Sequence, residues 1–195
     1  MNERTTALII VIPSVILLII IASIIIFNKG SPNEFTFEDE YKVVKLSERE
    51  YLIKGFVGEA PLNLKLIADP RNVKDIPSEE NIKNKLFPTS QIFITLKPNL
   101  TSTSVIAATE ISKITGHASL FNIPTKGALT EDSDNGAVPK ITCSDATYEE
   151  KVIHLKLSEE TKISSENNCI IIEGETEYDL IRASDKLVLQ LLEIL

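Results

Sequence analysis

Four consecutive residues with hydroxyl side chains, 101–104, follow shortly after the apolar run 91–96. Ligands of α/β proteins bind at the carboxyl ends of strands, and the free N–H groups at the start of a helix attract anions. We therefore expect a small anion or a sugar to bind here, with plain helix capping as the alternative. The candidate ligand-binding residues are Lys97, Thr101, Ser102, Thr103 and Ser104.

Acidic side chains follow a second apolar run, 169–173. Carboxylates at the start of a helix complement the positive end of its dipole, and they repel any anion that approaches. We interpret this group as helix capping. Its members are Glu173, Glu175, Glu177 and Asp179.

The chain has two cysteines, Cys143 and Cys169, each beside apolar residues typical of strands. An even pair in a domain outside the cytoplasm predicts a disulfide bond. The alternative is two buried thiols that behave as small apolar side chains. Cys143 could serve as a nucleophile with His154 only if its thiol were free.

Other chemical motifs are missing from the sequence. His117 and His154 are the only histidines, and they lack the short spacing of zinc ligands. The acidic loop 131–136 fails as a calcium-binding EF-hand because Thr142 stands where a bidentate glutamate is required. Isolated glycines exclude a phosphate loop, and there is no nucleophile elbow. The sequence thus predicts no catalytic residue, no metal and no cofactor, and we expect a protein that is not an enzyme.

The net charge of −8 argues against a nucleic-acid partner, because it repels a phosphate backbone. Asn99-Leu100-Thr101 is the one N-x-S/T sequon. A chain with 12 asparagines and this much Ser and Thr should contain roughly two by chance, so the motif carries no weight by itself.

An apolar stretch without charge runs from Ala7 to Phe27. As a helix it would span about 31 Å, which matches a bilayer core of about 30 Å. The stretch is too long for a secretory signal and lacks a small-residue cleavage site, so we expect an uncleaved anchor in the lipid bilayer. The domain organisation that follows is a tail at 1–6, a transmembrane helix at 7–27, a linker at 28–34 and a soluble domain at 35–195.

The flanking charges do not settle which side of the membrane the domain faces, because Arg4 and the α-amine oppose several lysines after the anchor. A short tail before a single anchor is typical of a signal anchor that leaves the following domain outside. We therefore expect an extracytoplasmic domain.

Periodicity in the remaining chain indicates a mixed α/β fold. An antiparallel meander is predicted over 41–46, 51–57 and 62–68, with a short helix from Ser78 to about Phe87. Two β-loop-α units follow, one with strand 91–96 and helix 105–115, the other with strand 169–173, a Thr176/Asp179 capping box and a helix to Leu195. We expect 91–96 and 169–173 to be the central strands, paired in parallel. Between the units we expect a long loop at 122–139, a short strand at 141–143 and a half-buried strand at 152–157.

Residues 101–116, TSTSVIAATEISKITG, resemble a segment of archaeal S-layer proteins, and 169–195 is similar to the end of archaeal membrane-anchored proteins without a characterised function. Ser104 stands where the S-layer pattern has an acidic residue. The resemblance implies a surface protein. We therefore expect a single-pass envelope protein with a structural or protein-interaction domain in contact with other envelope proteins. A tethered ligand-binding or sensor module, a tethered hydrolase and a pilin-like subunit are the alternatives.

Overall fold

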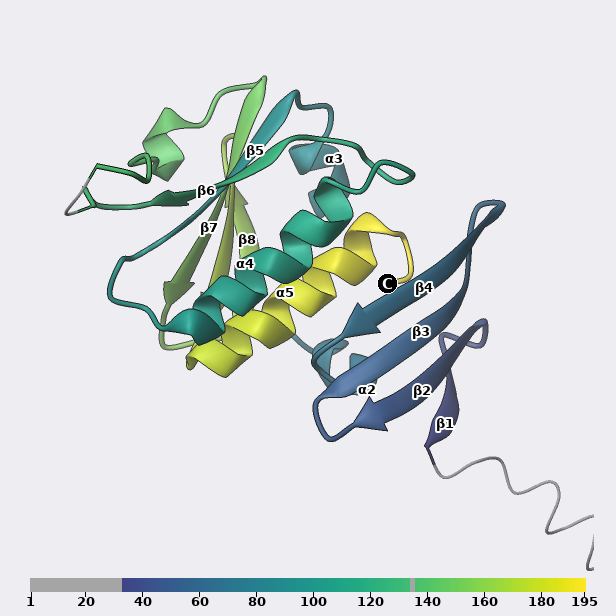
Figure 1. Ribbon diagram of the computed structural model, residues 1–195. Helices are drawn as coiled ribbons and strands as arrows, with labels where there is room; N and C mark the ends of the chain where they lie inside the picture. Colours follow the sequence, from purple (N-terminus) through teal and green to yellow (C-terminus); the bar gives the residue numbers. More distant parts are fainter. Residues whose placement is uncertain (1–32, 134–135) are drawn as a thin grey trace, which may run out of the picture. The chain divides into compact units, whose positions relative to one another are not determined.

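The computed structural model describes residues 33–133 and 136–195 and has a mixed α/β fold with two sheets (Figure 1). Residues 36–195 form one compact unit. The predicted tail and transmembrane helix at 1–27 lie outside the described residues. Within residues 33–133 and 136–195, no helix has the length and apolar character needed to cross a membrane.

The first sheet has four strands in sequence order, β1-β2-β3-β4. Alternate side chains along these strands are buried, among them Val43, Ile53 and Leu64, which is the period of a sheet with one face against a core. The predicted antiparallel meander is confirmed, and β1 is an addition. The strands are β1 (Glu34–Phe37), β2 (Tyr41–Ser47), β3 (Glu50–Val57) and β4 (Ala60–Leu66), with β2–β3 and β3–β4 antiparallel.

The second sheet is mixed and has the order β6-β5-β7-β9-β8. The first four are mutually parallel, and β8 is antiparallel to β9. Ile94, Ile153 and Ile170 stand in register across its centre and are buried. The strands are β5 (Gln91–Leu96), β6 (Thr125–Leu129), β7 (Glu150–Leu157), β8 (Lys162–Glu166) and β9 (Cys169–Gly174).

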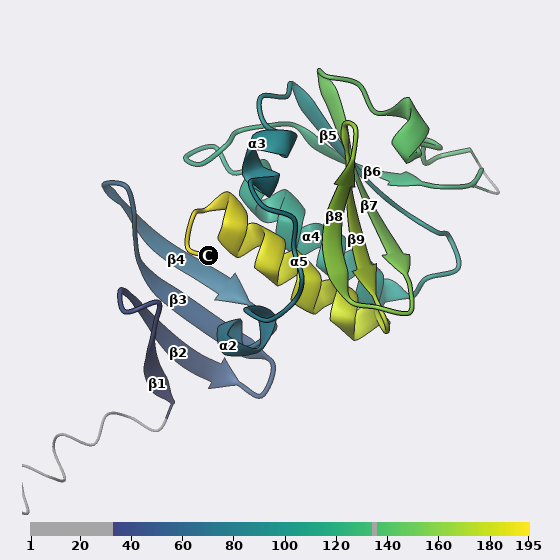
Figure 2. The ribbon, with the colours of Figure 1, turned by 180° about the vertical axis from the view of Figure 1, so that it is seen from behind.

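Two long helices, α4 (Ser102–Thr115) and α5 (Glu177–Leu191), lie side by side on one face of this sheet (Figures 1 and 2). The predicted capping box of Thr176 and Asp179 begins α5. The prediction of a single apolar face on this helix was too narrow, because Ala183, Asp185 and Leu189 are buried as well. Shorter elements are α2 (Pro70–Val73), α3 (Ile82–Leu86) and the 3-10 turn η1 (Cys143–Asp145).

The central strand was predicted wrongly. Strands 91–96 and 169–173 run parallel but do not pair, because β7 lies between them. Val152, Ile153 and Leu155 of β7 are each at most 1% exposed, whereas His154 and Lys156 are only partly buried and Leu157 is exposed. The alternation predicted for this half-buried strand thus holds over 153–156, and only its place between β5 and β9 was missed.

Several boundaries were also wrong. The loop predicted at 122–139 contains β6, and 141–143 is not a strand. The short helix begins at Ile82 with Asn81 as its N-cap, whereas Ser78 forms a bridge to Ile163. The last helix ends at Leu191 rather than at Leu195, and β8 and α2 were missed.

Gly174 joins β9 to α5 where the backbone is too crowded for a side chain. A Cβ there would lie 2.7 Å from the backbone nitrogen of Leu180 and 2.9 Å from the carbonyl oxygen of Thr176. Gly174→Ala is therefore expected to lower the free energy of unfolding by about 2 kcal/mol, since backbone must shift. Gly127→Ala is the control, because that Cβ would meet nothing within 4 Å. Equal urea midpoints for the two variants would contradict this prediction.

Candidate functional site

The carboxyl edge of the parallel strands is where the sequence predicted a ligand. Thr101 is the N-cap of α4 and accepts a hydrogen bond from the backbone N–H of Thr103 at 3.2 Å. Ser104 is fully buried, whereas Ser102 is exposed. The hydroxyl residues of this stretch thus surround the start of a helix, as expected of an anion site.

An internal anion already occupies this position. The Glu177 carboxylate accepts hydrogen bonds from the hydroxyl groups of Thr101 (2.7 Å) and Ser104 (2.9 Å). It also accepts from the backbone N–H groups of the same two residues, at 3.0 and 3.2 Å. The hydrogen bond from Thr101 is the main cause of a lowered pKa at Glu177, so the group is ionised at neutral pH. An external anion would have to displace this carboxylate.

Removing the internal carboxylate should create the site that the sequence predicted. Glu177→Ala is expected to cost about 1 kcal/mol of stability, because it removes hydrogen bonds at a helix cap. The variant should also gain more thermal stability from added sulfate than the wild type does, since the helix start becomes free. Glu175→Ala is the matched control, because it removes an equal charge from an exposed neighbour. Identical sulfate responses in all three proteins would argue against an anion-binding helix start.

Lys97 belongs to a different group of charges. Its charge and that of Lys156 act on His154, whose pKa is lowered chiefly by burial and then by these two lysines. The imidazole is therefore neutral at pH 7. Its Nε2 atom is buried and has no hydrogen-bond partner among the residues that the structure describes.

Glu173 anchors the charges on this face of the sheet. Its carboxylate lies 3.1 Å from the ammonium group of Lys156 and 3.8 Å from that of Lys162. Burial acts to raise the pKa of Glu173, but the hydrogen bonds from Lys156 and Ser158 and the charges of both lysines outweigh it, so the pKa is lowered. The prediction that Glu173 caps a helix was wrong, and no sequence pattern pointed to this cluster, because its members come from separate strands.

The predicted disulfide between Cys143 and Cys169 is present, with the two Cα atoms 5.2 Å apart. It ties η1 to the first residue of β9. The Nδ1 atom of His154 lies 3.9 Å from the sulfur of Cys143. Because that sulfur is bonded to Cys169, it is not a free nucleophile beside the imidazole.

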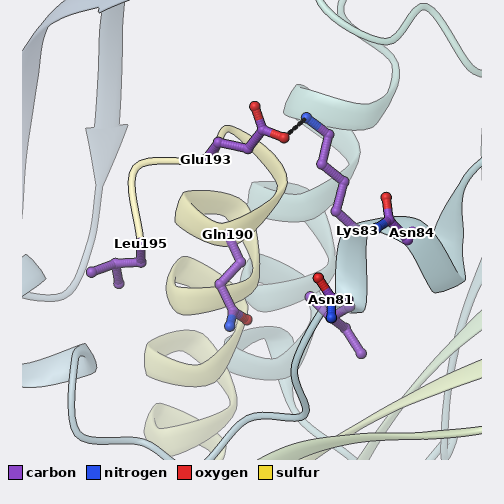
Figure 3. A pocket seen from close by; sticks show the side chains of 7 residues that line it. Asn81, Lys83, Asn84, Gln190, Glu193 and Leu195 are labelled. Carbon is purple, nitrogen blue, oxygen red and sulfur yellow. Dashed lines mark ion pairs between the residues drawn. The ribbon is translucent and has the colours of Figure 1, made fainter.

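A small hollow of about 190 Å³ opens between α3 and the end of α5 (Figure 3). At the rim of this hollow, the ammonium group of Lys83 lies 2.9 Å from the carboxylate of Glu193, and the two form an ion pair. The side-chain oxygen of Gln190 accepts a hydrogen bond from the hydroxyl of Ser78 at 2.9 Å. Its remaining lining residues are Asn81, Ile82, Asn84 and Leu195.

A second hollow of about 440 Å³ is lined by Ala68, Asp69, Asn72, Asp75, Tyr178 and Arg182. Two of its charged groups, Asp69 and Arg182, have internal partners. Asp69 binds the Arg71 guanidinium at 2.6 and 3.0 Å. Arg182 donates to Asp179 at 2.8 Å and to the carbonyl of Asn72 at 2.9 Å. Such mutual neutralisation is typical of structural ion pairs rather than of a catalytic centre.

Across residues 33–133 and 136–195, no three side chains among His, Cys, Asp and Glu are placed to hold a metal ion. Comparisons with protein-family models, with curated proteins and with solved structures give no match. The similarity to archaeal S-layer proteins therefore stays a prediction from short sequence segments.

Proposed function

We propose that this chain is a single-pass protein of the cell envelope. In this proposal, residues 7–27 anchor it in the lipid bilayer, and the α/β domain stands on the outer side of the membrane. The domain serves a structural or protein-interaction role toward other envelope proteins, a surface layer among them.

The disulfide between Cys143 and Cys169 is the observation that carries this proposal. Disulfides persist in oxidising compartments and are rare in the cytosol, where thiols are kept reduced. A domain tethered by one helix reaches an oxidising compartment only if it lies on the outer side. The apolar, uncharged character of residues 7–27 supports the tether.

The arrangement of charged groups supports a non-enzymatic role. Glu177 caps α4, and Glu173 pairs with two lysines. The one cysteine that lies near a histidine is bonded to its partner cysteine. These two carboxylates and this cysteine are thus engaged in holding the fold together.

Protease protection of intact cells tests the placement of the domain. Protease added outside should cleave the domain without detergent, while a cytoplasmic marker in the same cells stays intact. A domain that resists protease until the membrane is permeabilised would place it inside and overturn the proposal.

Thiol labelling of the unfolded chain tests the disulfide in the same samples. Maleimide should label neither Cys143 nor Cys169 until a reductant is added, and then it should label both. The variant Cys143→Ala provides the positive control, because its single remaining thiol, that of Cys169, must react. Full labelling of the wild type without reductant would remove the main support for an outer location.

A further inference from the structure

The turn between β5 and α4 presents an asparagine to solvent. The backbone N–H of Leu100 donates to the carbonyl of Lys97 at 3.2 Å and closes the turn. Asn99 lies in this turn, and Lys97, Pro98 and Asn99 are all exposed. The side-chain amide of Asn99 makes no hydrogen bond to any residue that the structure describes. It is therefore accessible and has no structural role that a modification would disturb.

Asn99 also begins the Asn99-Leu100-Thr101 sequon, the acceptor pattern for N-linked glycosylation, and the middle residue is not proline. We propose that Asn99 carries an N-linked oligosaccharide. This inference rests on the proposed function, because the transfer occurs on the outer side of the membrane. Glycosylated asparagines lie at the surface, and Asn99 is exposed in a turn. A sequon that arises by chance inside a strand or helix usually lacks both properties.

The folded structure adds a constraint on when the transfer occurs. The hydroxyl of Thr101 donates to Glu177 at 2.7 Å and accepts from the N–H of Thr103 at 3.2 Å. Thr101 is exposed, but a transferase that must contact this hydroxyl in the folded domain has to compete with Glu177 for it. Glu177 lies 76 residues further along the chain, so Thr101 is free until α5 has been made and has docked. Transfer during export, before α5 has docked, meets no such competition, and we expect the modification to occur then.

The chemistry requires one co-reactant, a polyprenyl-phosphate-linked or polyprenyl-pyrophosphate-linked oligosaccharide. The side-chain nitrogen of Asn99 attacks the anomeric carbon of the first sugar and forms a C–N bond. The bond between that carbon and the phosphate oxygen breaks, and the lipid phosphate leaves. The amide nitrogen loses one proton to the solvent, and no oxidant or reductant is needed.

A glycan at Asn99 would stand at the carboxyl edge of the parallel strands, beside Lys97. It would cover the place where the sequence predicted a ligand. Contacts with other envelope proteins would then use other faces of the domain.

Mass spectrometry of the full chain, purified from membranes of cells that naturally produce it, tests the proposal. The intact mass should exceed the peptide mass by that of an oligosaccharide, and the glycopeptide should contain Asn99. Asn99→Gln should return the protein to its peptide mass. Asn63→Gln is the matched control, because Asn63 is exposed but lies outside any sequon, and it should keep the added mass.

The wild-type chain at its unmodified peptide mass would overturn the proposal. If protease protection still placed the domain outside, only the glycosylation would fail, and the proposed function would stand. A domain found inside would overturn both. Glu177→Ala tests the timing. Glycan occupancy equal to that of the wild type supports modification before α5 docks, whereas a several-fold higher occupancy would show that the hydrogen bond from Thr101 to Glu177 limits the transfer and would contradict this timing.

Discussion

Asp185→Asn is expected to become progressively more stable than the wild type as the pH rises from about 5 to about 7, with a relative gain of about 2–3 kcal/mol. Asp185 is fully buried, and its Oδ2 atom accepts hydrogen bonds from the backbone N–H groups of Ala68 (2.7 Å) and Ile67 (3.1 Å). Its Oδ1 atom is buried without a partner among the described residues.

Burial is the main cause that raises the pKa of Asp185 to about 8, and the nearby charge of Glu110 adds to it. The two backbone donors and Lys113 act in the opposite direction. The folded state therefore holds a proton between about pH 4 and pH 8 that the unfolded state has released. The stability from this group is complete below the unfolded pKa and is lost as the pH rises toward 8, by about 1.4 kcal/mol per pH unit.

Asparagine keeps an oxygen that can accept both backbone hydrogen bonds, and it does not titrate. Pulse proteolysis in urea measures the free energy of unfolding of both proteins. It is performed on the full chain in detergent, at pH 5 and at pH 7. Asp185→Ala serves as the control for the hydrogen bonds and should be destabilised by about 2 kcal/mol at pH 5. Parallel pH profiles for the wild type and Asp185→Asn would show that Asp185 is ionised in the folded domain.

Loss of the disulfide is expected to destabilise the domain by about 3.5 kcal/mol. Cys143 and Cys169 are 26 residues apart, and the chain-entropy estimate for a loop of that length gives this value. The double variant Cys143→Ala/Cys169→Ala removes the bond without leaving a thiol. Its urea midpoint should fall relative to the wild type.

Reduction of the wild-type chain with a phosphine provides an independent measurement of the same quantity. The reduced wild type and the double variant should agree closely, because each lacks the bond but keeps the rest of the fold. The reductant should not change the midpoint of the double variant. An unchanged midpoint after complete reduction of the wild type would mean that the bond adds no stability.

Local patterns allowed much of the fold to be predicted. Alternation with turn residues located β2, β3 and β4, and the capping box of Thr176 and Asp179 located the start of α5. These signals lie within a few neighbouring residues, where the sequence is directly informative. The same is true of the paired cysteines, whose number pointed to a disulfide.

The missed features depend on residues that are distant in sequence. β6, with the sequence TKGAL, has little strand character of its own and forms by pairing with β5. β7 became central because β5 and β9 flank it, a relation that no periodicity encodes. For the candidate site, the sequence identified the hydroxyl residues, but it assigned Glu177 to the cap of its own helix, whereas Glu177 completes the cap of α4.

The strand order also sets how fast the domain can fold. β5 pairs with β7 through Gln91 and Glu150, and β7 pairs with β9 through Val152 and Cys169. Before β5 and β7 can form any hydrogen bond, the long loop between Gln91 and Glu150 must close. Contacts of such high order slow folding toward the range of milliseconds to seconds, roughly, even for a stable domain. The apolar strand β5 is made before its partners β6 and β7, so its side chains stay exposed to water until both have followed.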